Sequence, residues 1–122
     1  MRTFRSIVAI AIAAAPFAAN AQQSQGLSPD QKAFIAYHYC MLQAGMDASK
    51  TAVAEDQVFD LAFETCAATR AQAAEIGRQV PALLTALEEA DAQKRSNFPD
   101  WVRGVRERRA QFETQVRTAP AS

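Results

Sequence analysis

Apolar side chains recur at a spacing close to 3.6 residues in every long segment of the chain, and no segment alternates in the manner of a β-strand. Alanine is abundant, whereas the 122 residues include only 4 glycines and 5 prolines. The pattern therefore predicts an all-α fold. Three to four helices with short connections are typical of a small antiparallel helical bundle.

The first predicted helix has a complete set of start signals. Ser28 is the expected N-cap, Pro29 suits the first helical position, and Gln31 completes a Ser-x-x-Gln capping box. We expect this helix to run to about Ala44, with Gly45 as the residue that follows its C-terminus.

The middle of this helix is uncharged from Ala33 to Met46. Four of its larger side chains share one face, namely Phe34, Tyr37, His38 and Met41. A helix that is apolar nearly all round favours burial on several sides. The pattern predicts the central helix of the bundle, or a helix that also contacts a partner.

The rest of the chain predicts two or three further helices. A turn over 47–55 precedes a second helix over 55–79, and Pro81 predicts a break near 77–81 because proline removes a helical hydrogen bond. A third helix is expected over 82–95 and a fourth over 99–117, with a boundary at 96–99. The apolar stripe of the fourth helix consists of Trp101, Val105, Phe112 and Val116.

The N-terminal segment has the composition of a secretory signal peptide. Arg2 and Arg5 precede an apolar run over 7–19, which is short for a membrane span. Small residues at Ala19 and Ala21 match a cleavage site after Ala21. We expect a periplasmic or secreted protein; an uncleaved membrane anchor is the alternative.

The expected domain organisation follows from this cleavage. Residues 1–21 are the signal peptide, and residues 22–122 form a single helical domain with frayed tails at 22–27 and 118–122. Removing the signal peptide leaves 11 basic and 13 acidic residues. This balance gives no argument for nucleic-acid binding.

The two cysteines, Cys40 and Cys66, lie on consecutive predicted helices, about equally far from the turn between them. In an oxidising compartment they are expected to pair with each other and to join the two helices as a hairpin. Two free thiols or an intermolecular bridge are the alternatives. Their spacing is not that of a redox-catalytic Cys-x-x-Cys motif.

No motif commits the chain to a reaction, so we expect neither an enzyme nor a bound cofactor. His38 is the only histidine, and we expect it to be half-buried and hydrogen-bonded within the bundle. A ladder of carboxylates at Asp56, Asp60 and Glu64 lies opposite an apolar stripe and is expected to face water. Glu88, Glu89 and Asp91 form a second acidic cluster, and no metal site is expected from either group.

The last helix is the best candidate for an interaction surface, because basic residues surround its apolar stripe. This surface consists of Trp101, Arg103, Arg106, Arg108 and Arg109. Its basic charge contrasts with an acidic balance over residues 22–93. The alternative is that the apolar residues pack inward while the arginines neutralise the acidic body.

Three functional hypotheses follow. The first is a non-enzymatic interaction or structural module of the cell envelope, which acts as a homodimer or with a protein partner. The second is a small-ligand or copper-type metal carrier that uses His38 and Met41, because imidazole and thioether groups suit copper. The third is a binder of anionic membrane surfaces through the basic C-terminal helix.

Overall fold

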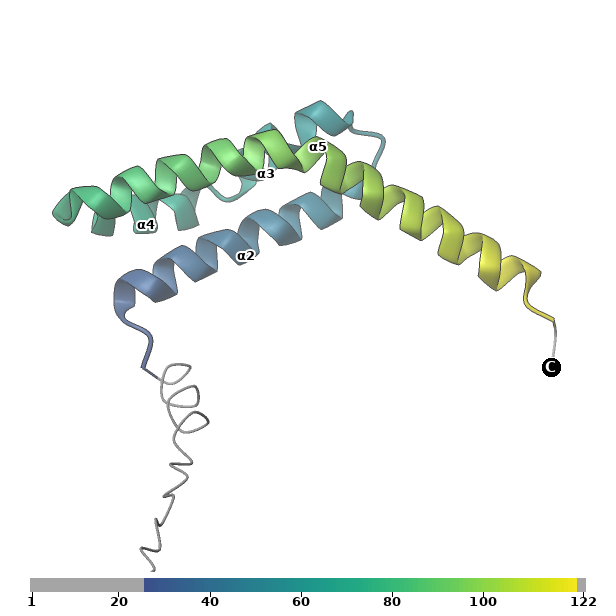
Figure 1. The fold of residues 1–122 in the computed structure, drawn as a ribbon, viewed down its shortest axis with the longest axis horizontal. Coiled ribbons are helices and arrows are strands. Elements are labelled where there is room, and N and C mark those ends of the chain that lie inside the picture. Colours follow the sequence, from purple (N-terminus) through teal and green to yellow (C-terminus); the bar gives the residue numbers. More distant parts are fainter. Residues whose placement is uncertain (1–25, 121–122) are drawn as a thin grey trace, which may run out of the picture.

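The structure is a computed structural model in which residues 26–120 are described, and within this range it is helical with no strand (Figure 1). The predicted signal peptide lies outside the described residues. The elements are α2 (Pro29–Ser49), a 3₁₀ turn η1 (Glu55–Gln57), α3 (Val58–Thr65), α4 (Ala67–Gln79) and α5 (Pro81–Thr118). The predicted all-α helical bundle is confirmed.

The predicted start of α2 is confirmed in detail. The backbone N–H of Gln31 donates to the Ser28 hydroxyl at 3.4 Å, and the backbone N–H of Ser28 donates to the Gln31 side-chain oxygen at 3.0 Å. Pro29 occupies the first helical position. These reciprocal bonds satisfy two N–H groups that the first helical turn leaves without intrahelical partners.

The predicted end of α2 is wrong, because the helix continues through Gly45 to Ser49. Gly45 is buried, and a Cβ atom built there would lie 2.6 Å from the Trp101 ring and 3.3 Å from the Phe98 ring. This glycine therefore provides space for two aromatic side chains of α5 rather than a helix terminus. Local sequence contains no information about that contact.

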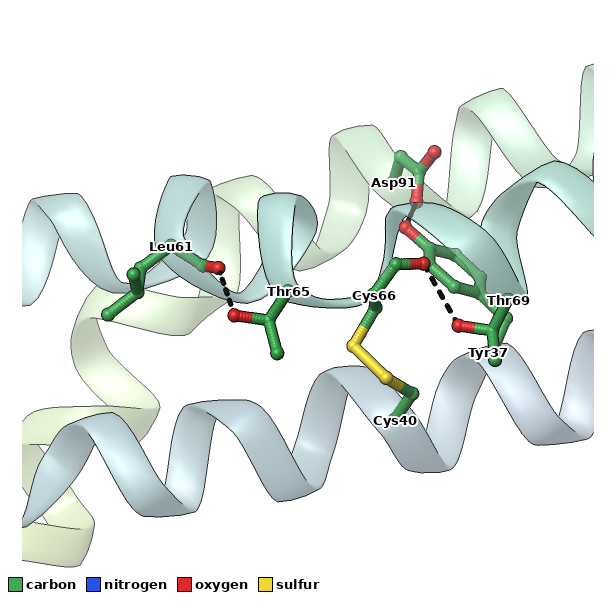
Figure 2. The surroundings of a disulfide bond; sticks show 7 residues. All are labelled: Tyr37, Cys40, Leu61, Thr65, Cys66, Thr69 and Asp91. Atoms are coloured by element: carbon green, nitrogen blue, oxygen red, sulfur yellow. Dashed lines mark hydrogen bonds between the residues drawn. A yellow bond between two sulfur atoms is a disulfide. The ribbon is translucent and has the colours of Figure 1, made fainter.

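The predicted helix over 55–79 is divided by a break at Cys66, where α3 ends and α4 begins. Cys66 forms a disulfide with Cys40 of α2, with the two Cα atoms 5.9 Å apart (Figure 2). The predicted pairing of consecutive helices is thereby confirmed. The predicted break near Pro81 is confirmed too: Val80 is extended, as the residue before a proline prefers.

The two predicted C-terminal helices are one helix of 38 residues, α5, so the predicted boundary at 96–99 is wrong. Pro99 lies inside this helix, which bends near its middle (Figure 1). The neighbouring side chains Phe98 and Val102 are 3% and 0% exposed. Their burial anchors the helix on both sides of the proline and offsets the hydrogen bond that the proline removes.

The helices alternate in direction, with α2 and α5 running one way and α3 and α4 the other way (Figure 1). Contacts between α2 and α5 occur in the same order along both helices. The Tyr37 hydroxyl donates a hydrogen bond to Asp91, and further along both helices Arg106 donates one to the carbonyl of Ser49. The core lies where α3 and α4 pack against both helices. Its largest fully buried side chains are Tyr37, Met41, Leu87, Val58, Val102 and Cys66.

Candidate interaction site

A groove runs between α2 and α5 and consists of two adjoining depressions of about 310 and 570 Å³. Both depressions are lined by His38, Leu42, Ala90 and Lys94. The remaining lining residues are Phe34, Ile35 and Tyr39 from α2, and Gln93, Asn97, Phe98 and Trp101 from α5. We call this surface the α2–α5 groove.

The groove follows from helical periodicity. Its α2 residues recur at intervals that place them on one side of the helix, next to the buried face that carries Tyr37 and Met41. Two of these side chains are exposed to solvent, since Ile35 is 39% exposed and Tyr39 is 66% exposed. The groove is thus a mainly apolar surface that the other described residues leave uncovered.

Lys94 is the one charged residue among those that line the groove. Its ammonium nitrogen lies 5.7 Å from the centre of the Tyr37 ring. Partial burial lowers the pKa of Lys94, and the nearby charge of Asp91 opposes this shift. A partly desolvated ammonium group favours an approaching carboxylate over a further cation.

Beneath the groove, the side chains of Tyr37, Arg70 and Asp91 form a hydrogen-bonded network across three helices. The Tyr37 hydroxyl donates to Asp91 Oδ1 at 2.6 Å, and Arg70 Nε donates to Asp91 Oδ2 at 2.8 Å. Figure 2 shows the tyrosine pointing at this carboxylate beside the disulfide. Burial, together with the bond to Asp91, raises the pKa of Tyr37.

Within this network, the opposite charges of Arg70 and Asp91 stabilise each other. Burial by itself lowers the pKa of Arg70, but the hydrogen bond and negative charge of Asp91 raise it overall. Among the described residues, no buried side-chain nitrogen or oxygen lacks a hydrogen-bond partner. We therefore interpret the network as a packing device that sets the relative positions of α2, α4 and α5.

Sequence reasoning missed the burial of Asp91, although a signal was present. The cluster of Glu88, Glu89 and Asp91 looked uniform, yet only Asp91 is buried, at 9% exposure. Asp91 follows Leu87 by four positions and precedes Phe98 by seven, so it falls on the inward stripe of α5. By contrast, the ladder of Asp56, Asp60 and Glu64 is exposed, as the sequence predicted.

The structure distributes the five residues of the predicted interaction surface over different roles. Trp101 lines the groove. Arg103 pairs with Glu55 at 3.0 Å and with Asp100 at 3.2 Å. Arg108 is exposed. The remaining two arginines, Arg106 and Arg109, bind backbone carbonyl groups.

Arg106 and Arg109 bind the C-terminal end of α2. Arg106 donates to the carbonyl oxygens of Ser49, Thr51 and Val53 at 3.1, 2.9 and 2.6 Å, and Arg109 donates to the Ser49 carbonyl at 3.1 Å. Cations at a helix C-terminus satisfy its free carbonyls and its dipole. These two side chains therefore fix α5 to the end of α2.

His38 and Met41 do not meet at one surface. His38 is exposed, so the expectation of a half-buried histidine is wrong, whereas Met41 is 0% exposed. Over residues 26–120, no group of three or more histidine, cysteine, aspartate or glutamate side chains is arranged to hold a metal ion. The same range contains no helix with both the length and the apolar character needed to cross a bilayer.

Comparison with protein-family models, with curated proteins and with solved structures found no match.

Proposed function

We propose that this chain is an exported, non-enzymatic protein-interaction module that binds an amphipathic helix in the α2–α5 groove. The observation that carries the proposal is the open apolar surface between two parallel helices, which includes the exposed side chains of Ile35 and Tyr39. Grooves of this kind bind amphipathic helices through large apolar side chains spaced three or four residues apart.

The topology supports a helical occupant. The bundle has an up-down-up order, with α3 and α4 antiparallel to α2 and α5 (Figure 1). A fourth helix antiparallel to α2 and α5 would convert this arrangement into an up-down-up-down four-helix bundle. The groove lies between the two helices that such a fourth helix would contact.

The buried polar groups next to the groove are used to hold the fold together rather than for catalysis. Tyr37 donates a hydrogen bond to one oxygen of the Asp91 carboxylate, and Arg70 donates one to the other oxygen. Nucleophilic catalysis needs a nucleophile within hydrogen-bond reach of a free base. The groups below the groove are instead committed to holding the helices together.

Export is supported by the N-terminal pattern and by the disulfide. Arg2, Arg5, the apolar run over 7–19 and the small residues before Gln22 are the features of a cleaved signal peptide. The Cys40–Cys66 bond fits an oxidising compartment, where disulfides form and persist.

A photo-crosslinking amino acid at position 39 tests the proposal in cells of the source organism. Tyr39 lies in the groove and is exposed, so its replacement leaves the core intact. We expect crosslinked adducts of a defined mass, in which the mature chain begins at Gln22 and both cysteines resist alkylation until they are reduced.

The matched control places the same crosslinker at Glu64, which is exposed on α3 and does not line the groove. Adducts from position 39 without equivalent adducts from position 64 support the groove as the binding site. No adduct from position 39, or the same adducts from both positions, would contradict it. An unprocessed chain with both thiols freely alkylatable would contradict export.

A further inference from the structure

Within residues 26–120, a second apolar surface is uncovered at the end of α5. We call residues 112–118 the arm; this part of the helix projects beyond the bundle (Figure 1, yellow end). Its two large apolar side chains, Phe112 and Val116, are 66% and 59% exposed. They stand four positions apart and therefore lie on one face of the helix.

We propose that the helix bound in the α2–α5 groove is the arm of a second copy of this chain, so that two chains form a two-fold symmetric dimer by exchanging arms. This inference rests on the proposed function and names its partner. Phe112 and Val116 supply the spaced apolar anchors that a helix-binding groove accepts. Exchange covers the α2–α5 groove and the apolar face of the arm in both chains at once.

The direction of the arm fits this assembly. A two-fold axis perpendicular to α5 makes the second copy of α5 run antiparallel to the first. The incoming arm is then antiparallel to α2 and α5, as a fourth bundle helix requires. A two-fold axis that places Lys94 of one copy beside Glu113 of the other also places the reciprocal pair together, because the symmetry repeats each contact.

Charge complementarity supports the same register. Lys94 is the charged residue of the groove lining, and its pKa is lowered by partial burial. Glu113 is adjacent to Phe112 on the arm and exposed. A carboxylate brought beside Lys94 compensates part of the desolvation of the ammonium group. The arrangement thus pairs the one charge of the groove with an acidic residue next to an apolar anchor.

The arm is held ready for binding by the contacts at its base. Arg106 and Arg109 tie α5 to the carbonyl groups at the end of α2. The helix continues from there without interruption to Thr118. A helix that is already formed and oriented loses less conformational entropy on binding than a flexible segment does.

The test uses two variants of the exported chain. The arm-free variant ends at Gln111, and the groove-blocked variant carries Ile35→Glu with Tyr39→Glu at exposed positions. Light scattering after size-exclusion chromatography is expected to show a dimer for the native chain and a monomer for each variant. An equimolar mixture of the two variants is expected to contain a heterodimer, because one intact arm meets one intact groove.

The control for the groove-blocked variant is Ala36→Glu with Gln43→Glu, two exposed α2 positions outside the groove lining, and it is expected to remain dimeric. Circular dichroism and retention of the disulfide show that each variant is folded. A monomeric native chain overturns the inference, as does an arm-free or a groove-blocked variant that stays dimeric. A monomer whose groove crosslinks another protein overturns the dimer and leaves the proposed function standing.

Discussion

At the scale of single residues, Asp91 is the polar centre of the fold. Its carboxylate accepts hydrogen bonds from Tyr37 of α2 and Arg70 of α4, while Asp91 itself belongs to α5. Burying a carboxylate is costly, and hydrogen bonds to charged partners offset that cost. Because both bonds are directional, the carboxylate also favours one relative placement of the three helices.

Replacing Asp91 by asparagine should lower the free energy of unfolding by about 2–3 kcal/mol, since it leaves Arg70 without its counter-charge. The expected loss is below that of a fully buried pair because the Arg70 side chain is 26% exposed. Urea unfolding of the oxidised protein measures it. Asp60→Asn, which breaks the exposed pair with Arg95, is the control and should cost under about 1 kcal/mol. Equal losses would refute a central role for Asp91.

At the scale of elements, the helices end and bend where tertiary contacts require it. α2 continues through Gly45 because Trp101 and Phe98 pack against that position. α5 continues through Pro99 because the side chains on both sides of the proline are anchored in the core. In each case packing overrides a local signal that usually ends a helix.

Two of the helical glycines, Gly45 and Gly104, provide a matched test of this conclusion. Gly104→Ala should raise the free energy of unfolding by about 0.5–1 kcal/mol, because alanine is the better helix former. Its new Cβ meets only Arg108 Nη1, at 3.5 Å. Gly45→Ala should bring no such gain, because its Cβ would lie 2.6 Å from the Trp101 ring.

Fluorescence of Trp101, the only tryptophan in the chain, provides the second readout. The emission maximum should shift in Gly45→Ala, where the ring must move, and stay unchanged in Gly104→Ala. Equal stabilisation by both substitutions, with unchanged emission, would show that the contact at Gly45 is not tight.

At the scale of the whole molecule, a small core is reinforced by one covalent link. The Cys40–Cys66 bond joins residues 26 positions apart and ties α2 to the junction of α3 and α4 (Figure 2). A domain of about a hundred residues has a net stability of only about 5–15 kcal/mol. By restricting the unfolded chain, the disulfide therefore contributes a large share of this net stability.

Removing the disulfide should lower the free energy of unfolding by about 3–4 kcal/mol in the chain-entropy account. The measurement compares the denaturant midpoint of the oxidised protein with that of a double variant that carries both Cys40→Ala and Cys66→Ala. Reductant should lower the midpoint of the native protein and leave that of the double variant unchanged. A native protein whose midpoint does not respond to reductant would contradict the prediction.

The sequence determined the features that depend on neighbours along the chain. Periodic apolar residues predicted helices, Ser28 to Gln31 predicted the start of α2, and Pro81 predicted the break before α5. The cysteine pairing was also predictable, since two cysteines on consecutive helices have few other options. The signal peptide and the export that it implies remain predictions from sequence.

Only the tertiary structure decided which side chains from distant segments meet. The groove combines His38 with Trp101, the buried carboxylate of Asp91 meets Tyr37, and Gly45 receives an aromatic ring. These contacts join residues more than fifty positions apart. The apolar repeat of a helix predicts which face is buried, but it does not predict which residues pack against that face. Propensity and capping act within a few residues, whereas burial depends on the whole packed chain.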